Sequence, residues 1–354
     1  NMTEFAAGLG DRFKYGDPRN PWDRERSAGG SSTGSAIAIV KALCAISLGE
    51  DTGGSIRYPA AITGIVGVRP TWGLVSRFGV LPISWSMDTV GPMTHTVEDA
   101  ALLMGAIAGY DPKDPLTAKL PVPDYRNALT GDLGGVRVGL VRELMDKAYV
   151  DPEVLQSVAT AAAQMEDLGA TVQDVSFPLL TETGPLMAVI AGSDGAYVVR
   201  DWLRTRPEDF GPSLRRRWLA ASLIPAQVLK KAERMRAILR REWLKLFEQF
   251  DVLLSPTHPV PAEKTQYEGA VTTREEAERR FAGRRYFTEA PALAGTPAMS
   301  VPCGYTSDGL PIGLQIMTAH FQEATMFKVG FAFEQKTQWH AKGIPTQNEK
   351  DITI

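Results

Sequence analysis

Two short glycine-serine segments near the start of the chain constrain its fold more than any other feature. They read AGGSSTGSA at 28–36 and GEDTGGSIRYPAA at 49–61, and the first serines of their Gly-Gly-Ser steps, Ser31 and Ser55, lie 24 residues apart. Glycine lets two backbones approach closely, and a serine hydroxyl can act as a nucleophile. The segments are therefore either two flexible loops or two halves of one site.

The first segment by itself supports no specific chemistry. Glycine-serine stretches are most often turns. A Walker A phosphate loop is set aside because no lysine follows Gly34, and the Gly-x-Gly-x-x-Gly fingerprint is also missing. Residues 30–34 match the Gly-x-Ser-x-Gly hydrolase elbow with Ser32 as nucleophile, but the polar residues before them do not predict the strand that this elbow requires.

The second segment favours serine chemistry. Thr52, Gly53 and Gly54 are slim residues directly before Ser55. Their backbone N–H groups can converge on an oxyanion, because no bulky side chain shields them. Ser55 would then attack a carbonyl whose oxygen enters this nest. Its hydroxyl still needs a base, and a second serine could relay the proton to a buried neutral lysine.

Composition excludes several classes of function. The 354 residues carry a formal net charge of −3, which gives no general attraction to nucleic acid or to an anionic membrane. Cys44 and Cys303 are the only cysteines, so no disulfide framework is expected and a reducing, cytoplasmic compartment is favoured. The four histidines are scattered and zinc spacings are absent, so neither a metal nor a cofactor is predicted. No apolar run is long enough to span a bilayer.

The patterns along the chain predict one α/β domain. A buried helix is expected over 32–47, and a helix capped by Thr96 is expected to stop near Gly109. A strand–helix–strand unit follows, with Asp151 as the helix N-cap. Helices are then expected at 184–250, a strand at 251–257, two strands within 298–317 and a closing helix at 323–337.

Four stretches carry a resemblance to a known family. They lie at 29–76, 86–115, 250–257 and 292–317, and they include GGSSTGSA, EDTGGSIRYPAA, SMDTVGPMTHTVEDAA, FDVLLSPT and GLPIGLQIM. Together they resemble the amidase signature family over essentially the whole chain. The resemblance implies an α/β fold with a central mixed β-sheet covered by helices on both faces. It implies a single domain over 1–354, with a helical excursion at about 184–250 on the substrate side.

The resemblance also implies roles for individual residues. Ser55 resembles the acyl-forming nucleophile, and Ser31, which follows a cis peptide bond in this family, resembles the proton relay. The implied reaction converts an amide to a carboxylate and releases ammonia or an amine. The resemblance also implies an oxyanion hole formed by the backbone of Thr52, Gly53, Gly54 and Ser55. The implied hydrogen-bonding supports are Ser32, Asp51 and Arg57.

Two departures from the family pattern stand out. Thr33 occupies a position where glycine is usual. The family's base is a lysine well upstream of the relay serine, and the resemblance places it before residue 1. Lys14 stands in a polar loop context and Lys41 lies in or at the end of a helix, so neither is expected to replace it. We therefore expect the N-terminal part of the fold to be missing and the chain as given to have little amidase activity.

Three functions remain open from the sequence. The first is a stand-alone amidase acting on a small-molecule amide, with a homodimer left open. The second is the glutamine-hydrolysing A-subunit of a tRNA-dependent amidotransferase, which alone would bring in tRNA and partner subunits. The third is an inactive fragment or degenerate homologue. The basic run at 214–245 is interpreted as a solvated amphipathic helix, because Glu233, Glu242 and regular apolar spacing interrupt it.

Overall fold

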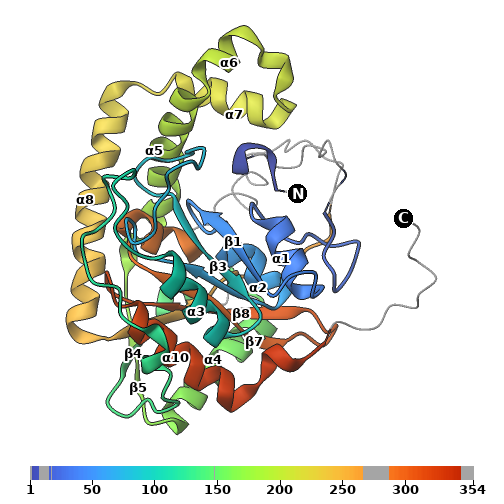
Figure 1. Ribbon diagram of the computed structural model, residues 1–354, viewed down its shortest axis with the longest axis vertical. Helices are drawn as coiled ribbons and strands as arrows, with labels where there is room; N and C mark the ends of the chain where they lie inside the picture. Colours follow the sequence, from blue (N-terminus) through green and yellow to red (C-terminus); the bar gives the residue numbers. More distant parts are fainter. Residues whose placement is uncertain (1, 8–15, 17, 147, 266–286, 344–354) are drawn as a thin grey trace.

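An eight-stranded mixed sheet runs through the computed structural model of the chain (Figure 1). The structure describes residues 2–7, 16, 18–146, 148–265 and 287–343. The strand order is β1-β3-β2-β7-β8-β6-β4-β5, with β4 parallel to β5 and β6 and every other neighbouring pair antiparallel. The strands are β1 (Ile46–Asp51), β2 (Val66–Arg69), β3 (Thr89–Thr94), β4 (Arg137–Val141), β5 (Thr171–Val175), β6 (Val252–Pro256), β7 (Ala298–Tyr305) and β8 (Pro311–Met317).

Helices cover both faces of this sheet, as the resemblance implied. Helix α2 (Arg57–Thr63) packs on β2, β7 and β8, and a side chain placed at Gly313 of β8 would meet Ala61 of this helix. Helix α10 (Glu323–Thr337) packs on β7 and β8 as well, with Met299 next to its Gly330. Alternate side chains along a strand point to opposite faces of the sheet. Both faces of the central strands are therefore buried under helices. The predicted mixed α/β fold is confirmed.

Capping residues set the ends of two predicted helices. Helix α3 (Val97–Ile107) begins after Thr96, whose hydroxyl oxygen accepts the N–H of Asp99. Helix α4 (Pro152–Asp167) begins after Asp151, whose carboxylate accepts the N–H of Glu153. These side chains satisfy N–H groups that the first turn of a helix leaves unpaired.

The helix expected over 32–47 is wrong in its second half. Helix α1 (Thr33–Val40) ends early, Ala42 has a left-handed φ of 53°, and the chain re-enters the sheet as the edge strand β1. The small apolar residues that suggested a long helix fit a strand equally well. Pairing of β1 with β3 decided between the two.

The sequence patterns did not predict the short helix α2. It starts two residues after Ser55 and contains Pro59 at its third position. Proline is tolerated there because the first-turn N–H groups have no partner within the helix. Its residues are almost all buried between the sheet and the first glycine-serine segment.

The excursion at 184–250 is helical, as predicted. It comprises α5 (Thr183–Val198), α6 (Arg200–Thr205), α7 (Pro212–Ser222) and α8 (Ala226–Gln249), and α6 and α7 lie at the top of Figure 1, away from the sheet. Trp218 of α7 packs with Leu203, Phe210 and Leu214 in a small core of its own.

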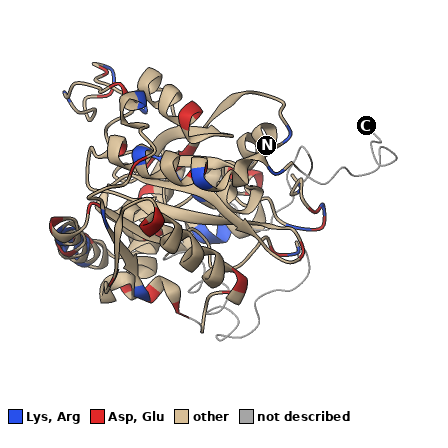
Figure 2. Ribbon diagram, turned by 90° about the horizontal axis from the view of Figure 1, so that it is seen from below, with Lys and Arg blue, Asp and Glu red and all other residues tan. Residues whose placement is uncertain are grey.

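Helix α8 has the amphipathic character that the basic run predicted. It buries Leu239 and Trp243 against the main core. On its exposed side Lys230 lies 2.7 Å from Glu233, and α8, seen end-on at the left of Figure 2, shows both charge signs. Acidic partners along the helix therefore offset part of its positive charge.

Two glycine substitutions test the packing of α2 on the sheet. A Cβ at Gly313 would lie 2.7 Å from the Cα of Ala61, so Gly313→Ala is expected to lower the free energy of unfolding by about 1–3 kcal/mol. A Cβ at Gly105, inside α3, meets no atom within 4 Å, so Gly105→Ala is expected to raise it by about 0.5–1 kcal/mol. Urea denaturation measures both, and equal midpoints for the two variants would contradict this packing.

Candidate active site

Ser32 joins the two glycine-serine segments. Its backbone N–H donates to the carbonyl oxygen of Ser55 at 3.1 Å. Its hydroxyl donates to the carbonyl of Glu50 at 3.2 Å, while the N–H of Glu50 donates back to that hydroxyl at 3.1 Å. A side chain at Gly49 would reach within 2.8 Å of the same hydroxyl, so the close approach needs glycine. The two segments therefore form one structural unit.

Ser31 and Ser55 lie on the two sides of this junction. The peptide bond between Gly30 and Ser31 is cis, as the resemblance implied. Ser31 is 3% exposed, and its Oγ has no hydrogen-bond partner among the described residues. Ser55 is half-buried in the turn between β1 and α2. Ser55 is thus more exposed than Ser31.

Asp51 holds the turn that carries Ser55. This fully buried carboxylate ends β1 and accepts the N–H of Gly54 at 2.7 Å and the N–H of Ile56 at 3.2 Å. It thereby grips the backbone on both sides of Ser55. The guanidinium of Arg57 also binds it, through Nε at 3.0 Å and Nη2 at 2.9 Å.

Buried arginines keep Asp51 ionised. Arg57 and Arg69 are both fully buried, and Nη1 of Arg69 lies 3.1 Å from the Asp51 carboxylate. Burial alone would raise the pKa of Asp51, but the charges of the two arginines hold it well below its usual range. Nη1 of Arg57 also donates to Gln315 of β8 at 2.7 Å. The turn is thus tied to the centre of the sheet.

The backbone N–H groups near Ser55 divide into two sets. The N–H of Gly54 donates to Asp51, as above, so it is already engaged in this structure. Those of Thr52, Gly53 and Ser55 make no hydrogen bond to another residue in the part of the chain that the structure describes. These three are the donors available to a developing oxyanion.

Residues from distant segments of the chain pack against the turn that carries Ser55. The hydroxyl of Thr288 donates to the carbonyl of Gly53 at 2.6 Å, and a Cβ at Gly54 would lie 2.3 Å from that hydroxyl. Gly54 has φ 127°, which side-chain-bearing residues rarely adopt. A Cβ at Gly53 would lie 3.1 Å from Cε of Met187 of α5. The helical excursion therefore reaches the candidate site.

Predicted site residues lie together around one turn, and other residues reach that turn from distant parts of the chain. The structure brings Ser31, Ser32, Asp51 and Ser55 together with Arg57, around one turn. Sequence reasoning missed Arg69, Thr288 and Gln315, which arrive from β2, the segment after 286 and β8. Their separation in sequence leaves no local spacing signal.

Of the two lysines considered from the sequence, the structure describes only Lys41. Lys14 lies outside the described residues. Lys41 is exposed at the C-cap of α1, as expected for a charge at a helix end. In the described part of the chain, no lysine or histidine is hydrogen-bonded to Ser31 or Ser55.

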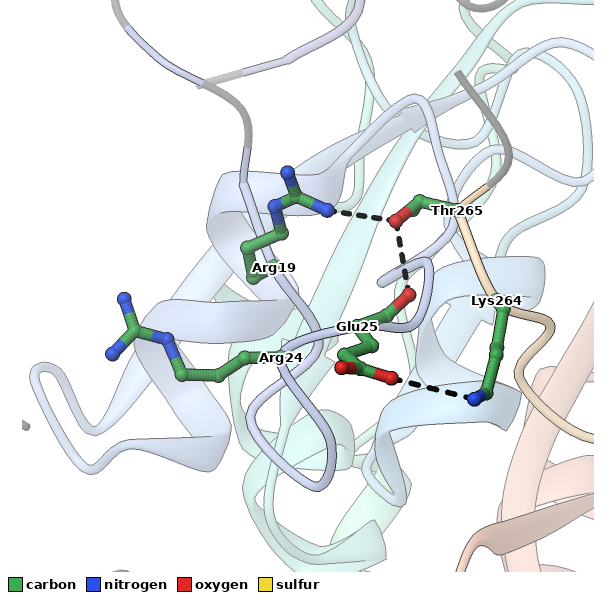
Figure 3. Close-up of a pocket in the computed structure, with 5 residues that line it drawn as sticks. All are labelled: Arg19, Arg24, Glu25, Lys264 and Thr265. Carbon is green, nitrogen blue, oxygen red and sulfur yellow. Dashed lines mark hydrogen bonds and ion pairs between the residues drawn. The ribbon is translucent and has the colours of Figure 1, made fainter. Parts of the chain in front are cut away.

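A separate pocket involves none of the predicted site residues. It is lined by Arg19, Arg24, Glu25, Lys264 and Thr265 (Figure 3). Arg19 donates to the hydroxyl of Thr265 at 2.7 Å, and Lys264 lies 3.4 Å from Glu25.

Within the described ranges, no cluster of three or more His, Cys, Asp or Glu could hold a metal ion. None of the helices described has the length and apolar character needed to cross a membrane.

Comparison with known proteins identifies a family and two kinds of relative. A family model described as Amidase matches residues 1–327. The glutamyl-tRNA(Gln) amidotransferase A-subunit of Thermosynechococcus vestitus is 40% identical over 366 residues, covering 96% of this chain and 74% of the relative. The structure of the same A-subunit from Thermotoga maritima has a TM-score of 0.81 at 34% identity, covering 95% of this chain and 72% of that chain. The peptide amidase of Stenotrophomonas maltophilia has a TM-score of 0.76 at 29% identity, covering 96% and 73%.

Removing one charge tests the role of Asp51. Asp51→Asn leaves two buried guanidinium groups without their carboxylate, so the free energy of unfolding is expected to fall by about 3–5 kcal/mol. The midpoint of urea unfolding at neutral pH measures this loss. Asp124→Asn, in an exposed ion pair with Arg126, is the matched control and should leave the midpoint unchanged. Equal midpoints for Asp51→Asn and wild type would contradict the conclusion that the Asp51 carboxylate compensates the two buried guanidinium groups.

Proposed function

Because this chain belongs to the amidase signature family, we propose that it hydrolyses a carboxamide through a serine acyl-enzyme, with Ser55 as nucleophile and Ser31 as proton relay. The observation that carries the proposal is the hydrogen bond from Ser32 to Ser55, which joins the two glycine-serine segments beside uncommitted backbone N–H groups. The oxyanion of the tetrahedral intermediate would accept hydrogen bonds from those groups.

The chemistry follows from the roles of the two serines. Ser55 Oγ forms a bond to the amide carbonyl carbon while its proton passes to Ser31. The C–N bond then breaks, and the nitrogen leaves with a proton as ammonia or amine. Water next attacks the ester, releasing the carboxylate and restoring Ser55. The resemblance assigns the final proton acceptor to a lysine upstream of Ser31, and that assignment remains a prediction.

The oxyanion donors we propose are three of the four expected from the sequence. The sequence predicted the backbone of Thr52, Gly53, Gly54 and Ser55. The hydrogen bond from Gly54 to Asp51 favours donation from Thr52, Gly53 and Ser55. Gly54 would join them only if its N–H left Asp51.

We favour glutamine as the amide, rather than a free small amide. The relatives at 40% identity are named as the A-subunit of glutamyl-tRNA(Gln) amidotransferase, whereas the peptide amidase is 29% identical. Partner subunits and charged tRNA would follow from that reading, and cytoplasmic location agrees with the free thiols of Cys44 and Cys303. Hydrolysis of a free carboxamide is the second candidate, since the peptide amidase shares the fold at a TM-score of 0.76.

Serine substitutions test the mechanism. Ser55→Ala removes the atom that bonds to the carbonyl, so whatever amide hydrolysis and fluorophosphonate labelling the wild-type chain shows are expected to fall to background. Ser31→Ala should slow labelling of Ser55 by about 100-fold or more, because the proton loses its path. Ser35→Ala, in the same helix as Thr33, is the matched control. Labelling that persists in Ser55→Ala would place the nucleophile elsewhere, and no labelling of wild type would favour the inactive reading.

Ammonia release distinguishes the two substrate classes. With glutamine as substrate, turnover that rises when amidotransferase partner subunits are added supports the favoured reading. Turnover of peptide amides or small amides without partners, and none with glutamine, would replace it with the stand-alone amidase. The Ser55→Ala variant supplies the background rate in both assays.

A further inference from the structure

Two carboxyl groups meet at the hydroxyl of Thr52, the first residue of the proposed oxyanion segment. Thr52 Oγ1 lies 2.9 Å from Oε1 of Glu50 and 2.8 Å from Oδ1 of Asp88. Both distances are those of hydrogen bonds. Glu50 precedes Asp51 on β1, and Asp88 comes directly before β3, so the contact lies at one end of the β1–β3 pair.

Counting protons shows that this arrangement needs one beyond the hydroxyl's own. A threonine hydroxyl donates one hydrogen bond, and an ionised carboxylate can only accept. Thr52 can therefore satisfy one ionised carboxylate but not two. For both contacts to be hydrogen bonds, one of the two carboxyl groups must carry a proton and donate it to Thr52 Oγ1.

The backbone around Asp88 favours its ionised form. Oδ2 of Asp88 accepts the N–H of Ile83 at 2.7 Å and the N–H of Ser84 at 2.9 Å. Glu50 has no comparable donors, since its Oε2 is buried and has no hydrogen-bond partner in the described part of the chain. A buried carboxylate oxygen without a donor is unfavourable, whereas a neutral carboxyl tolerates that environment better. The proton therefore belongs on Glu50.

The charge balance of the buried cluster agrees. Asp51, Arg57 and Arg69 are fully buried, and Asp88 is 3% exposed. Within this set of four, two carboxylates already balance two guanidinium groups. Ionising Glu50 would add a further negative charge close to Asp51 and Asp88, which is unfavourable.

We propose that Glu50 and Asp88 share one proton through the hydroxyl of Thr52, and that Glu50 thereby acts as a positioning residue for the oxyanion segment. The chain of donation runs from Glu50 to Thr52 to Asp88. Losing the proton leaves Thr52 able to hold only one carboxylate, and the turn before Ser55 loses an anchor. The proposal rests on the proposed function only in assigning Thr52–Ser55 to oxyanion binding.

The expected direction with pH follows from the surroundings. Burial, then the charges of Asp88 and Asp51, raise the pKa of Glu50 well above its ordinary value. Burial also raises the pKa of Asp88, against its backbone donors. A raised pKa in the folded state means that the stabilisation is present at low pH and is lost as pH rises through that pKa. The charged groups that act on the pair are Asp51, Arg69 and Arg77. Arg57 binds Asp51, and Asp194 and Arg236 lie one contact further away, at Ser84 and Ser86.

Carboxyl NMR tests the shared proton without relying on activity. In protein labelled with 13C at the glutamate carboxyl, the Glu50 resonance is assigned by its loss in Glu50→Gln. Its chemical shift is expected to be that of a protonated carboxylic acid at neutral pH, and it should move toward that of a carboxylate only as the pH is raised further. The amide resonance of Gly53 should shift with the same midpoint. A Glu50 resonance at the carboxylate position at neutral pH would overturn the proposal.

Kinetics test the positioning role. Glu50→Leu removes the donor and is expected to lower kcat about tenfold with little change in KM, the effect of one hydrogen bond. Glu50→Gln, whose amide can donate to Thr52, should restore most of kcat and lose the alkaline fall that wild type shows. Glu334→Gln is the matched control, since Glu334 is a buried glutamate that accepts the N–H of Val97, and it should keep that fall. An alkaline fall retained by Glu50→Gln would overturn the positioning role.

The two readouts keep the proposals separate. If no amide is hydrolysed while Glu50 and Gly53 still titrate together, the proposed function fails and the shared proton is supported. If hydrolysis proceeds while Glu50 is ionised at neutral pH, the shared proton fails and the proposed function stands. Circular dichroism of each variant checks that Glu50→Leu remains folded.

Discussion

The carboxylate of Asp51 lies between two buried guanidinium groups, and the rest of the candidate site depends on that contact. It fixes the N–H groups on both sides of Ser55, and through Arg57 and Gln315 it connects the turn to β8. A buried ion cluster of this kind contributes little net stability compared with apolar packing, but breaking it is strongly unfavourable. The ion cluster instead holds the turn that carries Ser55 in a single conformation.

The sequence predicted the parts of the site that are local. Ser31, Ser32, Asp51, Ser55 and Arg57 stand in two short segments, and glycine made their close approach a reasonable expectation. It could not predict the residues that come from far along the chain, such as Thr288 and Gln315, because contacts across the sheet depend on the fold and leave no spacing pattern.

Errors in the fold prediction have the same physical origin. The stretch after Val40 is small and largely apolar, and such residues suit a helix or a strand. Pairing with the distant residues of β3 decided for the strand. Helices with their own caps, such as α3 and α4, were predicted well because the determining hydrogen bonds are made between near neighbours in sequence.

The Ser32 contact has a consequence for how this chain can vary. The distance in space between the two glycine-serine segments is set by hydrogen bonds across the junction, and the covalent path between them passes through the exposed turn from Lys41 to Leu43. A surface turn pinned at both ends can absorb an inserted or deleted residue at small entropic cost. The interval of 24 residues between Ser31 and Ser55 contains α1, this turn and β1, so a change in the length of the turn alone would leave both glycine-serine segments in place.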